Sequence, residues 1–303
     1  METPLYSTNC PLSSSNIHNN YLKIAMDREI RFVVTYPERK KTKGTIVILE
    51  SYANAIEKYL LPINEISKRG FSTAIFDWFG REKLQFNKKQ KNRHYYFDIN
   101  SDINDLYVFL KEIVYRDCPP PYYMLTYGIG GLIAFGGLDF INHQFNRMLC
   151  VSPLFAPLGN KTNGFQHKLT QLLTDIGLGF LPAKGGKKLE HTTKQANMQL
   201  PPLQKNNVPF IKAPTSQWMA SVLNAIDSIK KNILHGHLQI PTLFILANQN
   251  NIANNIETRR LCQHTRLTES ITITGADLDT IMHEESHKKQ FWAAFDAFIL
   301  NER

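Results

Sequence analysis

The sequence is poor in cysteine and lacks long apolar runs, and both absences narrow the class of protein. Its four cysteines lie far apart and show neither CxxC nor metal-ligand spacing, which predicts reduced thiols: Cys10, Cys118, Cys150 and Cys262. No run of about 18 apolar residues occurs, so no transmembrane helix is expected. The first residues lack the basic start and apolar core of a secretory signal. These absences predict a cytoplasmic protein without a metal or other cofactor.

Positive charge is in excess, with a formal net charge of +9 over 303 residues. The excess is concentrated in three short stretches, at residues 39–43, 88–93 and 184–188. All three lie beside turn or loop signals, so we interpret them first as solvated loops. The functional alternative is a weak contact with an anionic membrane surface. No nucleic-acid-binding motif accompanies the basic stretches, so no nucleic-acid partner is predicted.

Apolar runs of strand length and amphipathic stretches of helix length alternate along most of the chain. The first two strands, 21–26 and 29–36, are predicted to form a hairpin at Asp27-Arg28. Six further apolar runs are predicted as strands: 45–49, 71–76, 122–126, 147–151, 241–246 and 270–274. Helices are predicted between them, including one that starts at Ser101 or Asp102. Such alternation is typical of a mostly parallel sheet flanked by helices.

The alternation breaks after the strand at 147–151. Residues 154–238 contain no convincing buried strand, but two amphipathic helices are predicted there, around Phe165–Ile176 and Trp218–Ile229. We interpret residues 154–238 as a helical lid inserted over the carboxyl edge of the sheet, where ligands of open α/β folds bind. The predicted organisation is a flexible arm at 1–18, a core at 19–153 and 239–303, and this lid.

One stretch, Tyr122–Phe135, changes from a β-prone apolar run to helical spacing across three glycines, Gly128, Gly130 and Gly131. A strand, a tight turn and a helix form the layout that presents the serine of a small-x-Ser-x-Gly motif in α/β hydrolases. Here the pattern is Thr126-Tyr-Gly128-Ile-Gly130, and glycine takes the place of the nucleophile. The frame of a nucleophile turn is present and its reactive atom is missing.

Further short motifs occur in a fixed order along the chain. They are Ile56-Glu-Lys-Tyr59, Arg69-Gly-Phe71, Asp77-Trp78, Asp117-Cys-Pro-Pro-Pro-Tyr122, Gly130-Gly131, Ser152-Pro153, Trp218, Pro241-Thr242, Gly275-Ala276 and Gln290-Phe-Trp-Ala-Ala-Phe295. From about residue 20 to the end, the chain resembles bacterial α/β hydrolases of the lysophospholipase and monoacylglycerol-lipase type, related to serine aminopeptidase S33. The resemblance implies an α/β-hydrolase fold, a helical lid and an acyl-ester or lipid ligand.

In that family the catalytic residues follow the chain order Ser, Asp, His, and the resemblance places each of them here on a residue that cannot act. The serine position is Gly128, which has no nucleophile. The acid position is Asn250, with Asn251 as the neighbouring choice, and neither carries a charge. The histidine position, in a Gly-x-x-His pattern, is Leu278, which cannot carry a proton. The resemblance therefore implies a degenerate triad.

The loop that would form the oxyanion hole also departs from the family pattern. Residues 50–54, Glu-Ser-Tyr-Ala-Asn, occupy the place of a glycine-containing turn, and an inward carboxylate at Glu50 would oppose a developing negative charge. The resemblance places five residues around the oxyanion hole and pocket: Ser51, Tyr52, Tyr127, Ile129 and Trp218.

Several other residues were considered as substitutes for the lost groups. Ser152 follows a strand, but Ser-Pro in that place resembles a packing turn of the family. His283 and His287 have i, i+4 spacing but no third ligand, so we interpret them as surface histidines. His235-Gly-His237 is predicted to be a loop.

The leading hypothesis is a lysophospholipase-like α/β-hydrolase-fold protein that has lost serine-hydrolase chemistry and keeps a lipid or acyl pocket, or a scaffold role for an unknown protein partner. One alternative is an active lysophospholipase or carboxylesterase with a relocated nucleophile. A third hypothesis is a remnant without a selected activity.

Overall fold

The computed structural model describes residues 16–26, 28–37, 41–51, 55–78, 98–156, 164–179, 181, 215–250, 253–278, 280–282 and 284–300. Most of the predicted N-terminal arm, the basic stretches at 88–93 and 184–188, and the site candidates Tyr52, Asn251 and His283 lie outside these residues.

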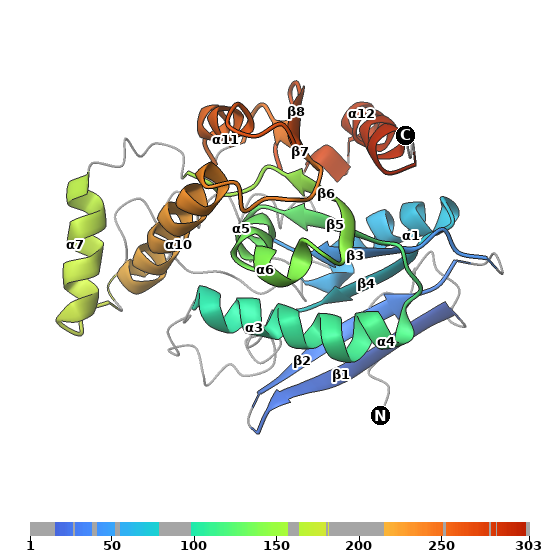
Figure 1. Cartoon of the computed structure of the whole chain (residues 1–303), viewed down its shortest axis with the longest axis horizontal. Helices are drawn as coiled ribbons and strands as arrows, with labels where there is room; N and C mark the ends of the chain where they lie inside the picture. The colour runs from blue at the N-terminus through green and yellow to red at the C-terminus, as the bar shows by residue number, and fades with distance from the viewer. Residues whose placement is uncertain are drawn as a thin grey trace.

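Within the described residues, eight strands form one sheet in the order β1-β2-β4-β3-β5-β6-β7-β8 (Figure 1). Their bounds are β1 Ile17–Ala25, β2 Arg28–Thr35, β3 Thr45–Leu49, β4 Ser72–Phe76, β5 Tyr122–Tyr127, β6 Phe145–Val151, β7 Thr242–Ala247 and β8 Thr268–Ile273. Strands β1 and β2 form the predicted hairpin and β2 pairs with β4 antiparallel, whereas all the other pairs are parallel. The mostly parallel sheet predicted from the alternation is confirmed.

Helices cover both faces of this sheet (Figure 1). Their bounds are α1 Leu60–Lys68, α3 Ile99–Phe109, α4 Tyr115–Asp117, α5 Ile129–Gly136, α6 Leu138–Ile141, α7 Gly164–Asp175, α10 Ser216–Leu234, α11 Asn255–Cys262 and α12 Glu285–Phe295. Apolar side chains of α1 and α12 pack on one face, and those of α3, α5 and α10 pack on the other. Successive side chains of a strand point to opposite faces of the sheet. In β3, Val47 and Leu49 therefore pack in one core cluster, and Ile46 and Ile48 pack in the other.

The starts of two elements, α3 and β1, lie furthest from the predicted ones. Helix α3 begins at Ile99 with Asp98 as its N-cap, not Ser101 or Asp102, because the Asp98 carboxylate accepts hydrogen bonds from the Asn100 N–H and the Ser101 hydroxyl. Strand β1 begins at Ile17, because its pairing with β2 continues to the end of that strand at Thr35.

The register of the parallel strands brings several loops to one edge of the sheet. Leu49 at the end of β3 pairs with Thr126 near the end of β5, and Tyr127 pairs with Val151 at the end of β6. Ala247 at the end of β7 pairs with Ile273 at the end of β8. The chain segments that follow β3, β5, β7 and β8 therefore begin side by side, at the edge where ligands of such sheets bind.

The segment between β6 and β7 contains two helices in its described part. Helix α10 packs on α5 and contributes Trp218, Val222 and Ile226 to the apolar core, whereas α7 packs against α10 and lies at the margin of the molecule (Figure 1). In the part of the chain that the structure describes, every helix is too short or too polar to cross a membrane.

Candidate functional site

The turn between β5 and α5 has the strand–turn–helix geometry that the sequence predicts. Strand β5 ends at Tyr127, Gly128 adopts a φ of 52° and a ψ of −113°, and α5 begins at Ile129. The Gly128 N–H donates to the Val151 carbonyl at 3.0 Å, and the Gly128 carbonyl accepts from the Leu154 N–H at 3.1 Å. These bonds join the turn to the end of β6. They hold Gly128 in a backbone conformation that residues other than glycine rarely adopt.

The two following glycines let α5 lie close to its neighbours. A Cβ placed on Gly130 would lie 2.5 Å from the carbonyl oxygen of Leu49, and one placed on Gly131 would lie 2.9 Å from the Cβ of Pro153. The close approach of α5 to the backbone of β3 and to the turn after β6 therefore requires glycine at both positions.

The space beside Gly128 is filled by two side chains. A Cβ placed on Gly128 would lie 2.9 Å from the Oγ of Ser51 and 3.4 Å from the Cδ2 of Leu278. Leu278 follows β8 and is partly buried against the core, and Ser51 follows β3. The structure therefore brings together the residues that the sequence assigned to the serine position, the histidine position and the oxyanion loop.

Asn250 lies in the turn after β7 and is buried, with 7% of its surface exposed. Its N–H donates to the Ala247 carbonyl, and its side-chain oxygen accepts from the Ala253 N–H at 3.2 Å. The turn is joined to the segment of Leu278, because the Gln249 N–H donates to the Ala276 carbonyl at 2.7 Å. Asn250 therefore holds its own turn closed beside the loop of the histidine position.

Two aromatic side chains hold the backbone of the loop after β3 by hydrogen bonds. The Ser51 N–H donates to the Tyr59 hydroxyl at 2.9 Å, and the Trp78 indole N–H donates to the Glu50 carbonyl at 3.2 Å. Glu50 is fully buried. Ser51, whose Oγ fills the space beside Gly128, is thus held in place through its backbone.

A buried ion cluster of Arg31, Glu57 and Asp77 supports the same loop. The Arg31 guanidinium donates to both oxygens of Glu57, at 2.7 and 2.9 Å, and its Nε donates to Asp77 at 2.6 Å. Asp77 also accepts from the Ile56 N–H at 3.0 Å. Burial alone lowers the pKa of Arg31, but the two carboxylates outweigh it and raise that pKa, so the guanidinium stays charged. The cluster ties β2 and the end of β4 to the segment that follows the oxyanion loop.

The remaining pocket candidates lie on different sides of the sheet. Tyr127 is buried against the Tyr59 ring, with ring centroids 5.0 Å apart. Burial, and to a smaller extent the neighbouring Tyr59 hydroxyl, raises the pKa of Tyr127 well above its ordinary value, so the phenol stays protonated. Ile129 is the first residue of α5 and is buried. Trp218, in the first turn of α10, packs in the core cluster on the opposite face from Tyr127.

The residues that could have replaced the missing catalytic groups make contacts that support the fold. The Ser152 hydroxyl accepts from the Ala247 N–H at 3.0 Å, so it links β6 to β7. His287 is buried rather than on the surface as expected, because α12 turns this side chain toward Gly275, where a Cβ would lie 3.4 Å from its Nε2. No group of three potential metal ligands gathers among the described residues. Burial raises the pKa of the Cys118 and Cys150 thiols to about 12, which keeps them unreactive.

Sequence reasoning missed two features of this site. Residues 31, 57 and 77 are far apart in the chain, and their ion cluster appears only when the strands pair. One signal was available, since Arg31 interrupts an apolar strand at a position that is buried, where a charge requires a partner. The approach of the Ser51 side chain to Gly128 carries no comparable signal in the sequence.

Solved structures of the same fold include several ester hydrolases. A soluble variant of the monoglyceride lipase of Saccharomyces cerevisiae, bound to a substrate analogue, has a TM-score of 0.68 and 13% identity, covering 92% of this chain and 94% of its own. A carboxyl esterase of Bacillus coagulans bound to glycerol has a TM-score of 0.68 and 15% identity, covering 94% and 98%. The monoacylglycerol lipase of Paleococcus ferrophilus has a TM-score of 0.65 and 16% identity, covering 90% and 98%. At these identities the likeness shows the fold.

No curated protein sequence matches the chain significantly. The family model of the serine aminopeptidases, S33, matches residues 40–284, which include strands β3 to β8 and the three assigned triad positions, Gly128, Asn250 and Leu278. This chain is a member of the serine aminopeptidase S33 family of α/β hydrolases.

Proposed function

We propose that this chain is a cytoplasmic protein of the lipase and esterase type that has lost serine-hydrolase catalysis and binds a lipid or acyl ester. The observation that carries the proposal is the closed space beside Gly128. Ser51 and Leu278 lie 2.9 and 3.4 Å from the position of a Cβ there, so a side chain at residue 128 would require Ser51 to shift. Without a base at 278 or an acid at 250, no group in the three assigned positions can activate a hydroxyl.

The ligand class is proposed from the relatives of known structure. The yeast relative holds a substrate analogue of a monoglyceride lipase, and two further neighbours are a carboxyl esterase and a monoacylglycerol lipase. The site lies at the same carboxyl edge of the sheet, and residues 154–238 would form the helical lid above it. Tyr127, Ile129, Ser51, Tyr52 and Trp218 are the proposed pocket residues. Lipid extracted from the purified protein and identified by mass spectrometry would identify the ligand.

Repair of the three assigned positions tests the loss of catalysis. Gly128→Ser alone is expected to show no turnover of short or long acyl esters and no labelling by a fluorophosphonate, because no base lies beside the new hydroxyl. The variant Gly128→Ser/Asn250→Asp/Leu278→His/Ser51→Gly removes the obstructing side chain as well. It is expected to give weak esterase activity, on the order of the 10³-fold rate over water that incomplete catalytic machinery retains.

The unmodified protein and the triple variant that keeps Ser51 are the controls for this repair. Fast turnover by Gly128→Ser alone would show that the histidine position is misassigned. Equal activity of the triple and quadruple variants would show that Ser51 does not obstruct the site.

A second candidate function is an active esterase with a relocated nucleophile, and the position of Ser51 favours it specifically. Its Oγ lies 2.9 Å from the position where the Cβ of a nucleophile at residue 128 would stand. Fluorophosphonate labelling of the unmodified protein that disappears in Ser51→Ala would establish this alternative. Absence of labelling in both proteins supports the loss of catalysis.

A further inference from the structure

Helix α7 and the turn after it expose large apolar side chains. Five such residues between positions 169 and 181 are between 37% and 58% exposed: Leu169, Leu172, Ile176, Leu178 and Leu181. Thirteen large apolar residues are exposed in the described part of the chain, so more than a third of them fall in this short stretch. Single exposed leucines are ordinary, but a contiguous group marks an interaction surface.

Three of these residues form one face of the helix. The Ile176 N–H donates to the Leu172 carbonyl at 3.1 Å, so the helical course of α7 extends to Ile176. At about 100° per residue, Leu169, Leu172 and Ile176 lie within roughly 60° of one another around the helix. The buried Thr170 lies roughly 100° or more away from all three. We call Leu169, Leu172 and Ile176 the α7 face.

Contacts with α10 hold the helix in this orientation. The Ser216 N–H donates to the Leu181 carbonyl at 2.8 Å, and the Gln217 N–H donates to the Gly179 carbonyl at 2.9 Å. These bonds join the end of the α7 segment to the first turn of α10. Figure 1 shows α7 on the far side of α10 from the sheet. Because the helix is already in place, a contact through its exposed face requires little further ordering of the chain.

Two opposite charges lie beside the α7 face, on one flank of it. Lys168 and Asp175 are the described charged residues of α7, and both are exposed. They are seven residues apart, so they lie about 20° apart around the helix and about 10 Å apart along it. That separation is too long for an ion pair within one helix, and neither residue has an ion-pair partner among the residues that the structure describes.

A second copy of the chain carries the complement of this face. When two α7 helices pack antiparallel about a two-fold axis near Leu172, this residue lies against its own copy, and Leu169 lies near Ile176 of the other helix. The same axis brings the charged flank of one helix against the charged flank of the other. Lys168 then lies at the level of Asp175 of the other copy, and the symmetry forms this pair twice.

A parallel arrangement does not pair these charges. It places each flank against the opposite flank of the other helix, where Leu173 lies instead of a charge. The two described charges of α7 also sum to zero, so they give no net attraction to an anionic surface. Antiparallel self-association is therefore the arrangement that satisfies both the apolar face and the charges beside it.

We infer that two copies of the chain associate through their α7 faces, antiparallel about a two-fold axis, with Lys168 of each copy paired with Asp175 of the other. A contact confined to two short helices is smaller than a standard interface of about 1,600 Å², so the dimer is expected to form reversibly. Its formation involves no ester or lipid. The inference therefore goes beyond the proposed function, and its tests are separate.

Sedimentation velocity at increasing concentrations of the full chain measures the self-association. The unmodified protein is expected to shift from monomer to dimer as its concentration rises. In Leu172→Gln/Ile176→Gln, the dissociation constant should rise roughly a hundredfold or more, because both copies lose apolar side chains from the contact. The matched control, Leu234→Gln/Ile256→Gln, makes the same change at two residues that are 55% and 60% exposed on α10 and α11. It should dimerise as the unmodified protein does.

Charge reversal tests the antiparallel arrangement. Lys168→Glu alone should raise the dissociation constant about tenfold or more, because the new carboxylate faces Asp175 of the other copy at both pairs. Asp175→Lys alone should weaken the dimer as well, because two ammonium groups then face each other. An equimolar mixture of the two variants should recover dimers with one copy of each, since both pairs then join opposite charges. Co-purification of one variant on the affinity-tagged other measures these heterodimers.

The inference is overturned if the unmodified protein stays a monomer from micromolar to millimolar concentration, or if the control weakens the dimer as much as the α7 variant does. It is also overturned if the two charge variants, each folded by circular dichroism, fail to form heterodimers when mixed. A monomer that pellets with phospholipid vesicles through Leu172 and Ile176 would assign the α7 face to lipid and would likewise overturn it.

Discussion

The two ends of the glycine turn after β5, Gly130 and Gly128, differ in the atoms that a side chain would meet there. At Gly130 a Cβ would meet the backbone carbonyls of Leu49 and Glu50 at 2.5 and 2.9 Å, which cannot move without moving β3. At Gly128 a Cβ would meet side-chain atoms of Ser51 and Leu278 instead. The packing end of the turn is therefore fixed by the fold. The other end, to which the resemblance assigns the nucleophile, meets only side-chain atoms, which a second substitution can remove.

In the loop after β3, the buried ion cluster that supports the loop differs in the same way from the tip of the loop at Ser51. Below the loop, Arg31 joins Glu57 and Asp77 in a cluster whose side chains are at most 10% exposed. At the tip, the Oγ of Ser51 lies 2.9 Å from the position of a Cβ on Gly128, the residue to which the resemblance assigns the nucleophile. The supports of the loop and its tip therefore depend on different residues, so a change at the tip need not disturb the framework.

The largest effect is expected from breaking the framework at its buried charges. Arg31→Met leaves Glu57 and Asp77 buried without their cation, and should lower the free energy of unfolding by about 3–5 kcal/mol. Urea unfolding followed by circular dichroism measures it. A small loss would show that the cluster does not support the loop, and that the contrast between framework and tip is wrong.

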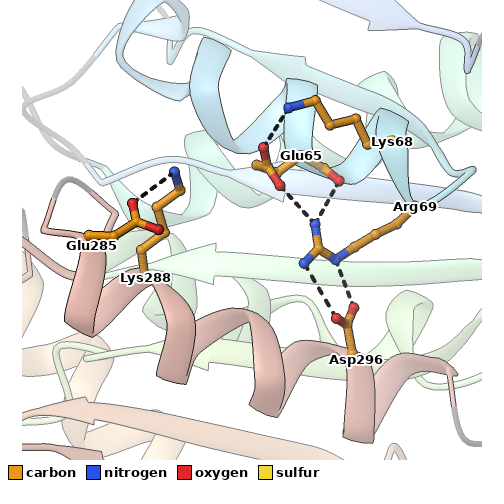
Figure 2. A network of polar contacts seen from close by, with 6 residues as sticks. All are labelled: Glu65, Lys68, Arg69, Glu285, Lys288 and Asp296. Carbon is orange, nitrogen blue, oxygen red and sulfur yellow. Dashed lines mark hydrogen bonds and ion pairs between the residues drawn. The ribbon is translucent and has the colours of Figure 1, made fainter.

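Arg69→Met is the matched control for this change. Figure 2 shows the Arg69 guanidinium between Glu65 and Asp296, a network that links α1 to the C-terminal helix. Its carboxylates are 24% and 40% exposed, and Arg69 also lies over the Trp292 ring at 4.2 Å. Methionine keeps an apolar contact with the ring, and solvent screens the carboxylates, so the loss should be about 1 kcal/mol or less.

A smaller effect is expected from overpacking the fixed end of the turn. Gly130→Ala should destabilise the protein by about 2–3 kcal/mol, because the new methyl overlaps backbone atoms of β3. Gly136→Ala, in the same helix, is the control. Its Cβ would meet the Ile103 Cδ1 at 2.4 Å, but that methyl group is the end of a flexible side chain. Equal melting temperatures for the two variants would contradict the claim that the backbone fixes this end of the turn.

Much of the fold could be predicted, because strand length, apolar alternation and glycine placement are local properties of the sequence. The nucleophile turn was recognisable for the same reason, since Gly128, Gly130 and Gly131 follow a β-prone run directly. The N-cap of α3 was placed too late, at Ser101 or Asp102. Its true cap, Asp98, precedes a polar first turn that carries no apolar spacing.

The orientation of helix α7 and the contacts between residues far apart in the chain could not be predicted from the sequence. The apolar spacing of α7 was recognised, but a period of 3.6 residues identifies a face without saying whether it points inward. The pattern did not say which side of α7 would be covered, and Leu172 and Ile176 are more than half exposed. Likewise Ser51 lies 77 positions before Gly128, and no local signal says that its hydroxyl fills the space beside that glycine.

The smallest of the three main effects is expected at Gly128, where it separates conformation from crowding. Gly128→Ala should lower stability by about 1–2 kcal/mol, because alanine rarely adopts the φ of 52° and its Cβ approaches the Ser51 Oγ at 2.9 Å. If crowding contributes, Ser51→Gly added to Gly128→Ala should recover part of this loss, with a coupling of at least about 0.5 kcal/mol in a double-mutant cycle. Strictly additive changes in unfolding free energy would mean that Ser51 does not obstruct the nucleophile's space. The Gly128 position would then be closed to a side chain by backbone conformation alone, a strain that an active relative's serine would have to bear as well.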